Sequence, residues 1–164
     1  MSERMLGEVG ALLDAYDGLR RADGERKRRA ENEQLAFLAG FVELRGKTVR
    51  PVFEAVGTLL QSRGHGFAIR EEEFVFQGDG RTTEALITIR ITPAGRESPT
   101  ASDDHLRELT FSTRHYNRTV SITNGAVPQS GSLAGANGSY TLAQVNSPLV
   151  EDEVLKLVAS LVRG

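Results

Sequence analysis

The spacing of apolar residues changes near residue 66, and this change limits the possible folds more than any other feature of the sequence. Before it, apolar residues recur every three or four positions, which is typical of amphipathic helices. After it, they alternate with polar residues, which is typical of half-buried strands. A helical pattern returns at the end. The sequence therefore predicts an α+β fold with N-terminal helices, an antiparallel sheet of four or five strands over 66–145, and a C-terminal helix over 148–162.

The N-terminal half predicts two helices, over about 4–20 and 26–63. The first has an apolar stripe with the alternating spacing of four and three residues that coiled coils use. Its members are Met5, Val9, Leu12, Tyr16 and Leu19, widened by Leu6 and Leu13. Asp23-Gly24 indicates a turn between the helices. In the second helix Arg45 interrupts the apolar seam, and Pro51, which has no backbone donor, predicts a kink.

The helix ending at residue 63 has apolar residues on two flanks, and each flank needs a cover. The sheet can cover one. The other can be covered by helix 4–20 folded back within the chain or by a second copy, and the pattern satisfies both. We expect residues 1–164 to form a single domain whose helical arm, 1–34, takes part in self-association. The candidate interface residues are Val9, Leu12, Tyr16, Leu19, Phe37 and Phe41.

The sheet is predicted to be a meander with one apolar face. The links between its strands are too short for helical crossovers, so neighbouring strands should be antiparallel. The predicted inward positions are Ala85, Ile87, Ile89, Ile91, Leu109, Phe111, Val120 and Ile122. The other face reads as polar and open to water. Ile69 and Phe74 differ in parity, which predicts a bulge near 71–73.

Composition excludes several classes of protein. The net charge is −2 and the pI about 6.0, so no global field favours nucleic acid or an anionic membrane. Acidic residues interleave with the basic run 26–29, which fits a solvated helix with ion pairs one turn apart. The absence of cysteine excludes disulfides and thiolate metal sites. Apolar runs fall far short of the ~20 residues that cross a bilayer, and no secretory signal precedes them, so we expect a cytoplasmic protein without membrane or nucleic-acid partners.

One turn contains residues suited to binding an anion. Arg114, His115, Asn117 and Arg118 surround it, and guanidinium groups match phosphate or carboxylate. The alternative interpretation is an ordinary exposed polar turn. His65 and His105 lack companions at metal-ligand spacing, so no metal site is predicted. No serine lies in a nucleophile elbow, and we assign no catalytic residue and no cofactor.

Two hypotheses of different classes follow. The first is a non-enzymatic interaction or scaffold module, a homodimer assembled through its N-terminal helices that could escort another polypeptide. Bacterial secretion chaperones offer an analogy, in size and acidity only. The second is a small domain that binds an anionic ligand with the 114–118 turn and the 124–138 loop. An enzyme is the less favoured form of this second hypothesis.

Overall fold

The computed structural model describes residues 2–96, 106–126 and 138–163. The chain divides into two compact units, Met1–Ala36 and Phe37–Gly164. The N-terminal unit is helical and belongs to α1 (Glu3–Leu44). This helix runs through Asp23-Gly24, where the sequence predicted a turn. A single glycine costs a helix only about 1 kcal/mol, and the Arg26 guanidinium bridges back to the Asp23 carboxylate one turn away. The predicted break is therefore corrected to a continuous helix.

The second unit contains the last turns of α1, a π-helical turn, and the helices α2 (Arg50–Ser62) and α3 (Ser147–Arg163). The π-helical turn η1 (Arg45–Val49) lies where the sequence predicted a kink. The Arg50 amide donates to the Arg45 carbonyl five residues back. Pro51 follows in the first turn of α2, where its missing N–H is tolerated. The helix therefore continues through this point, with hydrogen bonds that span five residues in place of four.

A five-stranded antiparallel sheet follows, in the order β1-β4-β5-β6-β7. Its strands are β1 (Gly66–Glu72), β4 (Leu86–Thr92), β5 (Glu108–Arg114), β6 (Thr119–Asn124) and β7 (Ser139–Tyr140). The meander predicted from the short links is confirmed. The last strand is shorter than the pattern indicated, because Leu142 already belongs to the 3₁₀ turn η4 (Leu142–Gln144).

A small hairpin, β2 (Val75–Gln77) and β3 (Arg81–Thr83), lies between β1 and β4. The predicted bulge is replaced by an interruption. Glu72 pairs with Leu86 and Val75 with Thr83, so the hairpin keeps one register across unpaired residues. On the other side of the chain the Thr113 amide donates to the Ala85 carbonyl at 2.9 Å, which continues the β4–β5 pairing by one residue.

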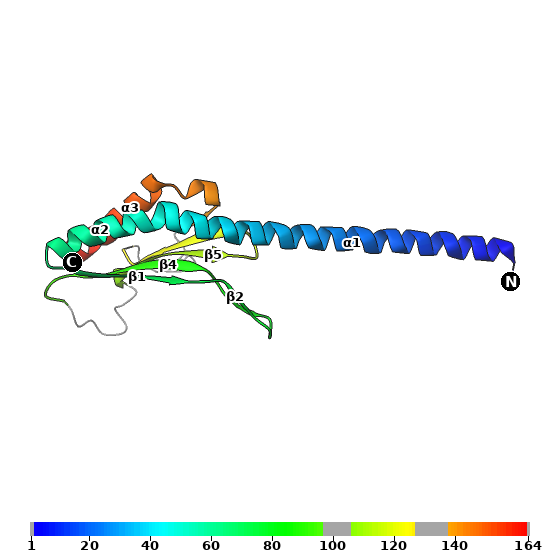
Figure 1. The fold of residues 1–164 in the computed structure, drawn as a ribbon, viewed down its shortest axis with the longest axis horizontal. Helices are drawn as coiled ribbons and strands as arrows, with labels where there is room; N and C mark the ends of the chain where they lie inside the picture. The colour runs from blue at the N-terminus through cyan, green and yellow to red at the C-terminus, as the bar shows by residue number, and fades with distance from the viewer. Residues whose placement is uncertain (1, 97–105, 127–137, 164) are drawn as a thin grey trace. The chain divides into compact units, whose positions relative to one another are not determined.

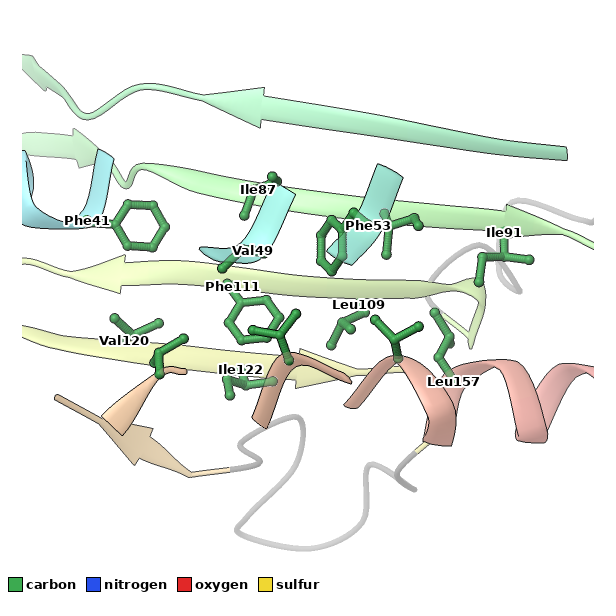
Figure 2. Packing of buried hydrophobic residues seen from close by; sticks show 14 of the residues in the cluster. Phe41, Val49, Phe53, Ile87, Ile91, Leu109, Phe111, Val120, Ile122 and Leu157 are labelled. Carbon is green, nitrogen blue, oxygen red and sulfur yellow. The ribbon is translucent and has the colours of Figure 1, made fainter. Parts of the chain in front are cut away.

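The core lies between the helices and one face of the sheet. Figure 1 shows α2 and α3 on the same side of the strands. All the predicted inward residues of the sheet are buried, from Ala85 to Ile122. In Figure 2, Phe41, Val49 and Phe53 of the helical layer lie over Ile87 and Phe111 of the sheet. Burying each such side chain contributes about 1.5–3 kcal/mol, so this layer contact provides much of the stability of the second unit.

Candidate interaction surfaces

The N-terminal unit exposes the apolar stripe that the sequence predicted. Leu12 is 71% exposed and Leu19 64%, with Tyr16 at 58%. The stripe, called the N-terminal stripe below, consists of Met5, Leu6, Val9, Leu12, Leu13, Tyr16 and Leu19. Single exposed apolar residues are ordinary, whereas a contiguous row of them marks an interaction site. The row therefore fulfils the geometric requirement for a helix-packing surface.

Charged side chains border the N-terminal stripe. Arg4 pairs with Glu8 one turn away, with Nε and Oε1 at 3.3 Å. At the other end, the Arg20 guanidinium lies 6.0 Å from the centroid of the Tyr16 ring, a cation–π distance. Arg20 and Arg21 are both exposed. The stripe thus ends at Arg20 and Arg21 with Asp17 beside them, a cluster of net charge +1.

Phe37 and Phe41, also predicted as interface residues, lie in the core of the second unit. They are 6% and 0% exposed. The two apolar flanks that motivated the dimer hypothesis are partly covered within this unit, because α3 packs against α2 and η1 and the sheet packs on the helical layer, but Val42 and Leu59 remain 44% and 56% exposed. The second cover is therefore the C-terminal helix, which the sequence reasoning did not consider. The candidate interface is reduced to Val9, Leu12, Tyr16 and Leu19 with their neighbours in the stripe.

A second apolar surface lies between α2 and α3, and sequence reasoning missed it. This α2–α3 groove encloses about 510 Å³ and is lined by Pro51, Val52, Ala55, Val56, Glu151, Val154 and Leu155. Its rim includes Leu155, which is 66% exposed. Leu59, one turn after Ala55 and Val56, is 56% exposed. The signal was available in the two apolar flanks of α2. The expected cover for the second flank was helix 4–20 or a second copy, so a groove shared with α3 was not predicted.

The α2–α3 groove has a direction and an acidic end. Pro51 and Glu151 both line it, and each lies near the start of its helix, so the two helices run the same way. Glu151 and Asp152 are exposed at that shared start. Arg63 and Arg163 are exposed at the opposite end. An amphipathic segment entering the groove would therefore meet carboxylates at one end and guanidinium groups at the other.

Arg114 and His115, two of the predicted anion ligands, engage different partners. Arg114 donates to the hydroxyl oxygens of Ser139 at 3.0 Å and Ser121 at 3.2 Å. His115 Nδ1 lies 2.9 Å from the Glu84 carboxylate. The two side chains accordingly do not converge on one point.

The other two predicted anion ligands, Asn117 and Arg118, lie in the turn itself. Asn117 Oδ1 accepts a hydrogen bond from the Thr119 hydroxyl at 2.6 Å. Arg118 has φ 55°, the left-handed conformation that a tight turn requires. Residues 127–137 of the loop invoked for the same site lie outside the described residues. The turn therefore provides local structure to the β5–β6 connection.

Arg45 is the buried cation that sequence reasoning treated only as an interruption. It is 5% exposed. Its Nη1 donates to the Glu72 carbonyl at 3.1 Å and to the Leu86 carbonyl at 3.4 Å. Its guanidinium also pairs with Glu71 and Glu73. Arg45 therefore joins the π-helical turn to the end of the β1–β4 pair, in the geometry that a buried charge needs.

Comparison of the chain with protein families, with curated proteins and with solved structures found no match. Within 2–96, 106–126 and 138–163, no group of three or more metal-ligating side chains is arranged to hold a metal ion. Among these same residues, no helix has both the length and the apolar character to cross a bilayer.

Proposed function

We propose that this chain is a non-enzymatic protein-interaction module that self-associates as a homodimer through its N-terminal stripe. The observation that carries the proposal is the exposure of that stripe, with Leu12 at 71% and Leu19 at 64%. Removing a leucine of this exposure from water contributes about 1.5–3 kcal/mol. Several such residues in one row supply a driving force for association.

The composition of the same helix supports a packing partner. Gly7, Gly10, Gly18 and Gly24 lie in its interior, and nothing lies within 4 Å of the Cβ positions they lack. Each glycine costs a helix about 1 kcal/mol relative to alanine. Helical stability in proteins comes mostly from packing an amphipathic face. A helix weakened in this way gains most from a partner that covers its stripe.

A second copy is the simplest partner, because it presents the same surfaces and a two-fold axis satisfies both copies at once. Size-exclusion chromatography with light scattering at tens of micromolar tests this directly. We expect twice the chain mass of 17.9 kDa. A wild-type monomer at this concentration would refute the proposal.

Replacing Leu12 and Leu19 together by glutamate should give a monomer with unchanged secondary structure by circular dichroism. Ala11→Glu with Gly18→Glu is the matched control, since each residue precedes a stripe position and the heptad spacing puts it outside the seam. The control should remain dimeric. If the stripe variant unfolds and the control does not, the stripe is part of an intramolecular core. If the stripe variant stays dimeric, the interface lies elsewhere. Either result contradicts the proposal.

A further inference from the structure

We infer that the α2–α3 groove of each copy is the docking site for the N-terminal stripe of the other copy. This inference rests on the proposed homodimer and specifies what the stripe contacts there. In such a dimer the two copies exchange their N-terminal helices, and one two-fold axis relates the two contacts. Width, length and charge each support the match.

The width of the N-terminal stripe fits two neighbouring helices better than one. A two-stranded coiled coil needs an apolar residue only at two positions per heptad. Leu6 and Leu13 add a third position, which makes the broader apolar face of a helix that packs on a layer. The α2–α3 groove is a depression between two helices of one layer. A helix lying in it would contact α2 with one side of the stripe and α3 with the other.

The lengths also match. Residues 5–19 extend over about 22 Å at 1.5 Å per residue. Helix α2 has 13 residues, or about 20 Å by the same rise. The exposed rim continues along α3, where Leu155 and Val162 are 66% and 60% exposed and share one helix face by their spacing. The groove with its rim, from Pro51 to Leu59 and from Glu151 to Val162, therefore runs along most of the stripe.

The distribution of charge favours one direction of the docked helix relative to α2 and α3. The stripe ends at Arg20 and Arg21, while the groove begins at Glu151 and Asp152. If the incoming helix runs antiparallel to α2 and α3, the basic pair meets these carboxylates. The reverse direction would bring Arg20 and Arg21 to Arg63 and Arg163, and like charges repel. The antiparallel arrangement is thus the favoured one.

Reciprocal docking covers more surface than pairing of the two N-terminal helices with each other. It makes two equal contacts per dimer and buries both apolar surfaces of each copy. A single helix pair makes one contact and leaves both grooves open to water. Stable interfaces bury roughly 1,200–2,000 Å² in total, and a doubled contact approaches that range more readily.

Cysteine cross-linking tests the inference, because the chain has no cysteine of its own. A tagged copy with Leu12→Cys is mixed with an untagged copy with Leu155→Cys, allowed to exchange subunits and oxidised. We expect a disulfide-linked species of mixed mass on a non-reducing gel. Ala11→Cys in place of Leu12→Cys is the control and should cross-link much less. Cross-links only between two copies of the Leu12→Cys variant would overturn the inference in favour of direct helix pairing.

A second measurement separates this inference from the proposed function. Leu155→Glu should raise the dimer dissociation constant at least tenfold, whereas Ser160→Glu, at another exposed position of α3, should leave it unchanged. If the wild type is a dimer and Leu155→Glu leaves the dimer dissociation constant unchanged, groove docking is refuted and the homodimer is not. A monomeric wild type refutes the homodimer and the docking together.

Discussion

The side-chain amide of Asn124 donates two hydrogen bonds to Glu153, one to its backbone carbonyl at 2.9 Å and one to its carboxylate at 2.7 Å. Asn124 ends β6 and Glu153 lies on α3, and they are 1% and 4% exposed. The side-chain oxygen Oδ1 of Asn124 in turn accepts a hydrogen bond from the Ala126 amide at 2.9 Å. This pair joins the sheet to the helix that covers it, and neither partner has ready access to water.

Asn124→Asp should therefore destabilise the second unit strongly. It removes the amide donor and brings a second carboxylate against that of Glu153, so we expect a loss of about 2–4 kcal/mol at pH 7. Urea unfolding followed by circular dichroism measures it. The control is Asn117→Asp in the exposed β5–β6 turn, where an aspartate can still accept from Thr119. If both variants unfold at the same urea concentration, the amide pair has no special role.

Gly57→Ala should destabilise the protein although alanine favours helices. A Cβ at Gly57 would clash with the ring of Phe67, which forces the ring or α2 to move. Such overpacking costs roughly 1–3 kcal/mol, more than the ~1 kcal/mol that alanine gains in a helix. We expect a lower melting temperature by calorimetry.

Gly24→Ala is the matched control, since nothing lies within 4 Å of the Cβ that would be added there. It should leave the melting temperature of the second unit unchanged. Combining Gly57→Ala with Phe67→Leu should recover part of the loss because the smaller side chain relieves the clash. No recovery in the double variant would show that the cost arises from another cause.

Acid should loosen the turn of the β2–β3 hairpin. The Arg81 side chain, and then its backbone amide, hydrogen-bond to Asp79 and lower the pKa of that carboxyl. A lowered pKa in the folded state means that the ionised group stabilises the turn above its unfolded pKa of about 4. This contribution is lost as the pH falls through the folded value.

Amide chemical shifts of Gly80 and Arg81 between pH 7 and pH 2 would follow this loss. Arg81→Gln should move the transition to higher pH, because it removes the main cause of the lowered pKa. Asp79→Asn should abolish the transition at these two amides. A transition that persists in Asp79→Asn would belong to another carboxyl group.

Much of the fold could be predicted from the sequence because periodicity records burial. The alternation from Ala85 to Ile91 identified the buried face of β4, and these side chains are buried in the structure. Pro51 located the irregular helical turn because its missing donor acts locally. Such features depend on neighbours in sequence, and they were predictable for that reason.

Features that depend on distant partners were not predictable in this way. Arg45 is tolerated in the core because strand carbonyls and carboxylates surround it, and a pattern of apolar residues contains no sign of them. The sequence similarly indicated that α2 needs two covers but not that α3 supplies one. The helix through Gly24 shows the same limit for local turn signals, which flanking helix formers overrode.

The two candidate surfaces differ in the same way: one depends on neighbours in sequence, and the other depends on distant partners. The N-terminal stripe followed from spacing alone, and the structure leaves its predicted members Leu12 and Leu19 exposed. Phe37 has the same spacing pattern but is buried, because its cover comes from residues far along the chain. The α2–α3 groove depends on how two helices distant in sequence lie together, so the pattern of neither helix alone predicts it.

The uninterrupted register of the β2–β3 hairpin constrains how its turn can vary. Glu72 faces Leu86 and Val75 faces Thr83 in one common register. The number of residues between β1 and the loop 78–80 therefore equals the number between that loop and the matching position of β4. Adding one residue to β2 or β3 alone would shift their pairing by one position and exchange the faces of the residues beyond the insertion. Length changes in this arm of the sheet should therefore be tolerated in pairs, one residue on each strand.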